Sequence, residues 1–101
     1  MRHHLTGSKF RTAKTTFKVV EAETYPATKV SRRYKGILAF KPGFLVAVGF
    51  RGTCIPNITG GNGVVRLTKI EVDGEIFDRP STISEVLGVE RPMTPYQLRQ
   101  L

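Results

Sequence analysis

The chain has 101 residues, 40% of them apolar and 9% aromatic, which is enough for one globular core and too few for two. A single cysteine, Cys54, excludes an internal disulfide, and the longest apolar stretch, 37–50, is interrupted by Lys41-Pro42-Gly43 and is shorter than the roughly 20 residues of a membrane-spanning helix. These features predict one soluble, cytoplasmic domain without a membrane segment or a secretory signal.

Positive charge is concentrated in the N-terminal half. The chain contains 16 Lys and Arg against 8 Asp and Glu, a net charge of +8. Residues 1–51 hold eleven of the basic residues but only Glu21 and Glu23, whereas residues 52–101 hold five basic and six acidic residues. This asymmetry indicates a surface for a polyanion, nucleic acid first and an acidic protein or anionic membrane second. Charge that merely keeps a small protein soluble is the alternative.

The first fifteen residues differ in composition from the rest. They combine four basic residues with Gly, Ser and Thr, contain no acidic residue, and have only Leu5 and Phe10 as large apolar side chains. Such a segment cannot bury a face of its own. We therefore predict a flexible basic arm over residues 1–15 and a single β-rich domain over residues 16–101.

Three strands are predicted in the following part of the chain. Residues 16–25 alternate between apolar and polar and end at Pro26. Residues 34–40 and 44–50 flank the turn 41–43 and predict a β-hairpin. Both faces of segment 44–50 are apolar, which predicts a central strand covered on both sides.

A loop is predicted over residues 51–63, because it contains Pro56 and the Gly-rich run 59–63. The next predicted strand, 64–72, changes the phase of its apolar residues at Thr68-Lys69, which indicates a bend or a bulge.

Asp73-Gly74 predicts a type I′ turn into a last strand at 75–77. Helices are expected only near the C-terminus. Thr82 to Glu85 has the spacing of a capping box, and Gly88 would end that helix. The segment 94–101 repeats the spacing and predicts a second short helix, so that both would cap an open end or edge of the sheet.

One resemblance supports the barrel. Lys41-Pro42-Gly43-Phe44-Leu45-Val46-Ala47-Val48, followed by Gly61-Asn62-Gly63-Val64-Val65-Arg66-Leu67, resembles the opening and return strands of SH3-like small barrels in translation and transcription proteins. The resemblance covers about a third of the chain. Together with the pattern it implies a mainly β fold, a small five-stranded, partly open SH3-like barrel with a basic N-terminal arm and short C-terminal helices, and it favours nucleic-acid binding.

No catalytic or metal-binding motif is found. The Gly-rich run lacks the Lys-Ser/Thr ending of a P-loop and precedes a strand where nucleotide-binding loops need a helix, so we expect a hairpin loop. His3 and His4 are adjacent and no other histidine exists, which is a poor metal ligand set. Cys54 has no histidine at a recognisable spacing and is expected to be a structural thiol. We therefore expect neither an enzyme nor a cofactor.

The basic residues and their aromatic neighbours form the predicted site. Lys and Arg bind phosphates, and aromatic rings stack on unpaired bases. The predicted nucleic-acid-binding residues lie in the arm, in the strand after it and in the connection before the hairpin: Lys9, Arg11, Lys14, Lys18, Lys29, Arg32, Arg33, Tyr34 and Lys35.

Three functions fit these features. The first is a small non-enzymatic module that binds DNA or RNA through the phosphates. The second is an accessory or inhibitory protein of a phage or mobile element that binds an acidic protein surface. The third is a structural subunit of an assembly, and an exposed edge strand could pair copies into a homo-oligomer.

Overall fold

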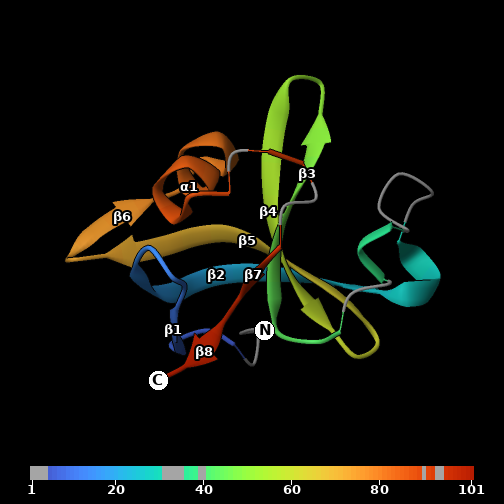
Figure 1. The fold of residues 1–101 in the computed structure, drawn as a ribbon, viewed down its shortest axis with the longest axis horizontal. Helices are drawn as coiled ribbons and strands as arrows, with labels where there is room; N and C mark the ends of the chain where they lie inside the picture. The colour runs from blue at the N-terminus through green and yellow to red at the C-terminus, as the bar shows by residue number, and fades with distance from the viewer. Residues whose placement is uncertain (1–4, 31–35, 39–40, 90, 93–94) are drawn as a thin grey trace.

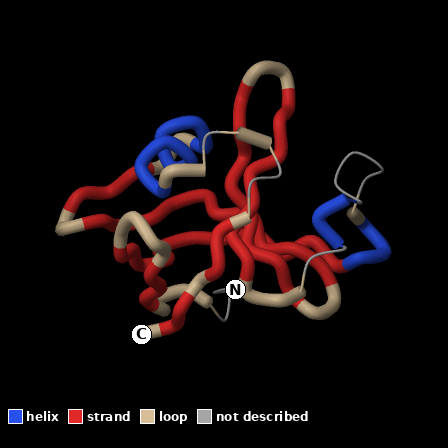
Figure 2. Tube along the Cα trace, in the orientation of Figure 1, coloured by secondary structure: helices blue, strands red, loops and turns tan. Residues whose placement is uncertain are grey.

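The structure is a computed structural model that describes residues 5–30, 36–38, 41–89, 91–92 and 95–101. Strands make up most of the described chain (Figure 2). In chain order the elements are β1 (Lys9–Arg11), β2 (Thr16–Pro26), the 3-10 helix η1 (Ala27–Lys29), β3 (Phe44–Phe50), β4 (Thr53–Gly60), β5 (Gly63–Val72), β6 (Glu75–Phe77), α1 (Pro80–Leu87), β7 (Tyr96–Gln97) and β8 (Arg99–Gln100). Within these ranges, no helix has the length and apolar character needed to cross a membrane.

The strands form one antiparallel sheet in the order β7-β3-β4-β5-β2-β1-β8, with β6 beside β5 (Figure 1). Only Leu98 separates β7 from β8, yet β7 pairs with β3 and β8 pairs with β1. The C-terminal segment thus bridges two distant strands and nearly closes the sheet into a barrel. The predicted mainly β, barrel-like fold is confirmed, but the expected number of five strands is wrong, because the described residues contain eight.

The main core lies inside this barrel. Phe10 and Phe17 meet there from β1 and β2, with ring centroids 5.9 Å apart. Apolar side chains of β3, β4 and β5 complete the interior, and α1 covers one end with Ile83 and Leu87, both fully buried. Gly88 ends α1 in the left-handed conformation at φ 79°, which confirms the predicted stop.

A second apolar cluster covers the outer face of the sheet. It contains Val46 and Val48 of β3, whereas Leu45 and Ala47 of the same strand face the main core. Ile37, fully buried, joins this outer cluster from the connection after η1. The prediction that β3 is covered on both faces is therefore confirmed.

The phase change in β5 is also confirmed. Glu21 of β2 is paired with Lys69, and the next residue of β2 is paired with Leu67, so Thr68 is an extra residue in β5. A second irregularity, at Val20 of β2, lies directly beside it. The two together allow side chains of opposite sequence parity on β5 to face the same core. The next turn has Asp73 at φ 51° and Gly74 at φ 83°, the positive values of a type I′ turn.

Two predictions in the middle of the chain are wrong. Residues 53–60, expected within a loop, form β4, and Pro56 is tolerated because β4 pairs with β5 only from Asn57 onward. The predicted strand 34–40 is a 3-10 turn over its described residues 36–38; the others lie outside the described residues. The apolar signal there came from Ile37, which fills the outer cluster.

The ends of the chain also differ from expectation. The predicted helix over 94–101 is wrong, since its described residues form β7 and β8. Part of the segment predicted as a flexible arm lies in the sheet as β1, because Phe10 is buried against Phe17. The turn after β1 is held by Thr12, whose Oγ1 accepts hydrogen bonds from the backbone N–H groups of Lys14 and Thr15, both at 3.1 Å.

At Gly63 the backbone of β5 lies close to that of β2. A Cβ atom at this position would overlap the carbonyl oxygen of Tyr25 and lie 2.9 Å from Pro26 Cα. We expect Gly63→Ala to lower the free energy of unfolding by about 2–3 kcal/mol, because backbone must move to make room. Urea denaturation measures the change. Gly61→Ala is the matched control: its Cβ would meet only Pro42 Cγ, at 3.9 Å, and should change stability by less than about 0.5 kcal/mol. Equal losses in both variants would contradict the close approach.

Candidate functional site

The site is built on the outer face of β1 and its two neighbours. Side chains alternate along a strand, and Phe10 points into the core, so Lys9 and Arg11 point outward. Lys9 is paired with Lys18 of β2, and Arg11 is paired with Arg99 of β8. Paired residues of antiparallel strands share a face. We call these four residues the basic face: Lys9, Arg11, Lys18 and Arg99.

In the two pairs that involve β1, each charge of the basic face lies opposite a like charge. Like charges directly opposite each other in an antiparallel pair destabilise the sheet, and here two such pairs are adjacent. Neither β1 nor β8 contains an acidic residue. Between described residues, one ion pair occurs, and it joins Lys69 Nζ to Glu21 Oε1 at 3.7 Å on β5 and β2, outside the basic face. An anion placed over β1 and β8 would convert repulsion into attraction.

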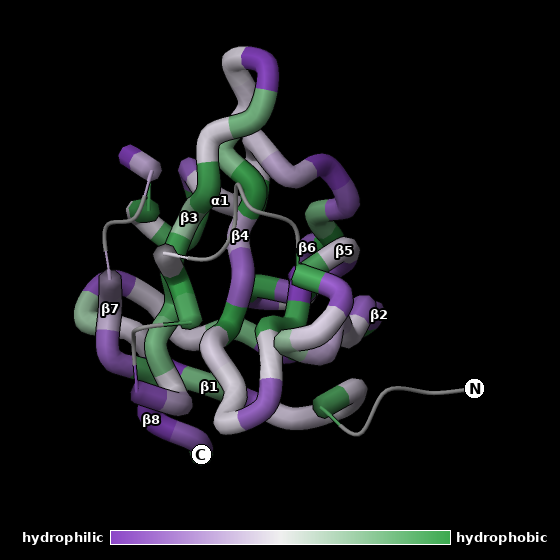
Figure 3. Tube along the Cα trace, turned by 90° about the vertical axis from the view of Figure 1, so that its right-hand side faces the viewer, coloured by the Kyte–Doolittle hydropathy of each residue, from purple (hydrophilic) through white to green (hydrophobic). Residues whose placement is uncertain are grey.

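Acidic side chains mark one border of the basic face. Glu71 of β5 is paired with Lys18 on the side away from β1. A hollow of about 260 Å³ lies at this border, lined by Lys9, Thr16, Lys18, Glu71 and Asp73 among others. The positive charge is therefore densest toward β1 and β8, and β8 has the colour of hydrophilic residues at the bottom of Figure 3.

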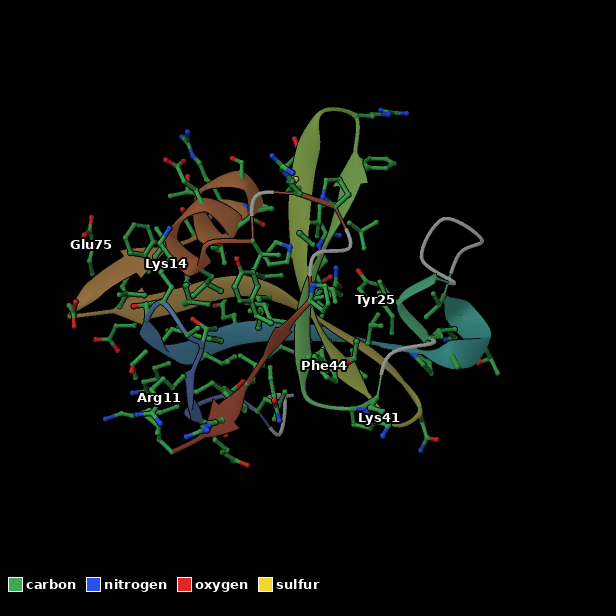
Figure 4. All side chains as sticks on the ribbon, viewed as in Figure 1. Arg11, Lys14, Tyr25, Lys41, Phe44 and Glu75 are labelled. Carbon is green, nitrogen blue, oxygen red and sulfur yellow. The ribbon has the colours of Figure 1, made fainter. Side chains whose placement is uncertain are left out.

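The other predicted site residues lie elsewhere. Lys14 extends over the C-terminal end of α1, where a Cβ on Gly88 would come within 2.7 Å of its Cδ (Figure 4). A positive charge there is favourable for the helix dipole, so Lys14 has a structural reason for its position. Lys29 is exposed in η1, at the other end of the long axis from β1 (Figure 1). The predicted residues Arg32, Arg33, Tyr34 and Lys35 lie outside the described residues.

Arg99 is the member of the basic face that the sequence interpretation missed. The capping spacing near residue 94 predicts a helix at this position instead of a strand. The alternation of half-buried Tyr96 and Leu98 with exposed Gln97 and Arg99 was the signal for a strand.

Tyr25, an aromatic neighbour of the predicted site, has a polar partner of its own. Its hydroxyl donates a hydrogen bond to Glu23 Oε2 at 2.6 Å. This hydrogen bond, with partial burial, raises the pKa of Tyr25 above its usual 10.0, while Arg66 acts in the opposite direction. The ring also packs against the outer apolar cluster. Tyr25 is therefore engaged on the sheet surface, far from Arg11 (Figure 4).

The Gly-rich run connects β4 to β5, as expected for a hairpin loop. Thr59 anchors it: its Oγ1 donates to the carbonyl of Lys41 at 2.7 Å and accepts from the N–H of Phe44 at 2.9 Å. The run borders a groove of about 460 Å³ that is lined mainly by apolar side chains, including Leu5 and Ile58. None of the described residues that line this groove has a charged side chain, so they offer a polyanion no counter-charge.

The remaining candidate groups do not form a reactive centre in the described chain. His3 and His4 lie outside the described residues. In the ranges that are described, no three His, Cys, Asp or Glu side chains are grouped to hold a metal ion. Cys54 is half-buried in β4 and packs against the main core. Ser84 Oγ donates a hydrogen bond to the carbonyl of this cysteine at 3.0 Å, which ties α1 to β4.

Comparison of the chain with family models, with curated proteins and with solved structures gives no match. The resemblance to SH3-like barrels therefore stays a prediction, and function has to be argued from the surface itself.

The Tyr25 hydrogen bond predicts a shift in titration. In a Tyr34→Phe, Tyr96→Phe background, Glu23→Gln should lower the pKa of Tyr25, because the carboxylate that favours the neutral phenol is lost. Ultraviolet absorbance of the phenolate measures this pKa.

The linked effect on stability has a definite sign. The pKa of Tyr25 is higher in the folded state than in the unfolded state, where it is about 10. The resulting contribution to the free energy of unfolding is fully present below pH 10 and is lost as the pH rises through the folded-state pKa. The difference in the free energy of unfolding between the protein with Glu23 and its Glu23→Gln variant should therefore decrease in that alkaline range. An unchanged Tyr25 titration in the Gln variant would contradict the hydrogen bond.

Proposed function

We propose that the protein is a non-enzymatic module that binds the phosphate backbone of nucleic acid on its basic face. The observation that carries the proposal is the cross-strand pairing of like charges, Lys9 with Lys18 and Arg11 with Arg99. A folded protein gains nothing from such pairs by itself, and each pair is relieved when an anion bridges it.

The arrangement suits a string of phosphates better than one isolated anion. Paired Cα atoms in a sheet are about 5 Å apart, and alternate residues along a strand are about 7 Å apart, so the four cations are spread over a small area and do not converge on a point. Exposed Lys and Arg side chains of this kind bind the backbone without reading bases. Affinity should consequently be strongly salt-dependent.

Neutralising the exposed part of the face tests the proposal. The variant Lys9→Gln, Arg11→Gln, Arg99→Gln should bind a mixed-sequence single-stranded oligonucleotide about 10- to 100-fold more weakly at low salt. Each lost phosphate contact removes about 0.7 from the log–log salt slope of a single strand, so the slope should become shallower by about 2. Fluorescence anisotropy over a salt series measures both quantities.

A matched variant separates the face from the total charge. Lys29→Gln, Lys41→Gln, Arg79→Gln removes the same number of exposed charges from other places on the surface, and it should keep most of the affinity and slope. If this control loses as much as the first variant, binding follows net charge and not the basic face. If the unmodified protein binds polyglutamate and ignores DNA and RNA, an acidic protein surface is the partner and the proposal fails.

A further inference from the structure

The outer end of the β3–β4 hairpin, residues 49–54, projects beyond the barrel and α1 in two perpendicular views (Figure 1, Figure 3). We call it the finger. Its last strand pair is Phe50 with Thr53, so only Arg51 and Gly52 form the tip. Pro92 packs against Gly49 at the base: a Cβ atom on this glycine would lie 3.0 Å from Pro92 Cγ. The finger is thus supported at its base and carries one cation at its end.

The residue at the tip is unfavourable for the turn that it occupies. Arg51 has φ 50° and Gly52 has φ 81°, the positive values of a type I′ turn. The first position of such a turn favours Asn, Asp or Gly, because other side chains are strained in the left-handed region. The β5–β6 hairpin of the same chain has the same turn at φ 51° and 83° and places Asp73 there. The sequence therefore meets the turn's preference at one hairpin and departs from it at the finger.

Within the described chain the Arg51 side chain packs on a ring but forms no ion pair. The ion pair between described residues involves Lys69 and Glu21, not Arg51. The guanidinium carbon of Arg51 lies over the ring of Phe50, 5.2 Å from its centroid. Phe50 is itself 36% exposed. A planar cation held over a ring, at the end of a projecting hairpin, is arranged to stack on a further flat group.

We propose that the finger is a stacking contact for an unpaired base of the single-stranded nucleic acid whose backbone the basic face binds. The inference rests on the proposed function for its ligand class. Guanidinium planes stack on bases with little sequence preference, which matches a tip that carries a single planar cation. A contact with phosphate alone would be kept on a strand that lacks bases, because the phosphates are unchanged.

The experiment compares Arg51→Gly with the unmodified protein on two probes, a single-stranded oligothymidylate and an abasic oligonucleotide of the same length. The probes share their phosphates and differ only in their bases. Arg51→Gly should bind the oligothymidylate about tenfold more weakly and the abasic probe only slightly more weakly. Gly adopts a positive φ without strain, so the variant should be at least as stable as the unmodified protein, and loss of binding cannot be attributed to unfolding.

Two further variants complete the design. Arg51→Lys keeps the charge and loses the planar group, and it should resemble Arg51→Gly on the oligothymidylate. Lys29→Gln removes one exposed cation from another part of the surface and should bind both probes nearly like the unmodified protein. Equal losses on both probes, or full activity of Arg51→Lys, would show a phosphate contact and overturn the stacking inference. No loss in Arg51→Gly overturns it as well.

The two proposals fail in different ways. If the unmodified protein binds neither probe at low salt, the proposed function fails. If it binds both probes with equal affinity through the basic face, only the inference about the finger fails. The same holds if it prefers the oligothymidylate over the abasic probe and Arg51→Gly keeps that preference.

Discussion

The structure depends on the C-terminal segment that joins the two ends of the sheet. The N–H of Leu98 donates to the carbonyl of Gly43 at 3.0 Å, and the N–H of Leu101 donates to the carbonyl of Lys9 at 2.9 Å. The first bond lies at the change from β7 to β8 and the second directly after β8, and they satisfy backbone groups beside β3 and in β1, which would otherwise be open edges. Without this bridge β1 would have only β2 as a neighbour, and Arg99 would have no reason to lie beside Arg11.

Closure of the sheet also separates the two sides of β3. One face completes the barrel interior, which α1 covers at one end, while the other face packs under the connection that contains Ile37. A strand buried on both faces is firmly held in its register, since a slip by one residue would exchange Val46 and Ala47 between two cores of different shape. The finger is the continuation of this strand, so its direction is set by packing on both sides of its base.

Charge is distributed in accordance with this architecture. The interior and the outer cluster are apolar, and the β2–β5 part of the surface combines Glu21, Lys69 and Glu71 with neighbouring groups of opposite sign. Uncompensated positive charge remains on β1 and β8, and a single cation remains at the finger. A backbone-binding face and a stacking tip at separate places on one small barrel would let a single strand be held by its phosphates and touched at one base.

Local signals in the sequence determined much of this fold. Alternating apolar residues located β2 and β3, the phase change at Thr68 marked the bulge, and Asp73-Gly74 and Gly88 marked a turn and a helix end, because each depends on backbone preferences within a few residues. Tertiary pairing alone decided that residues 9–11, 53–60 and 96–100 are strands. The first segment is short, the second contains Pro56, and the third follows a capping-like spacing. Each becomes a strand only because a partner distant in sequence supplies its hydrogen bonds. The charge asymmetry is a property of the composition and can be read from the sequence. The pairing of Arg11 with Arg99 depends on tertiary strand pairing and cannot be read from it.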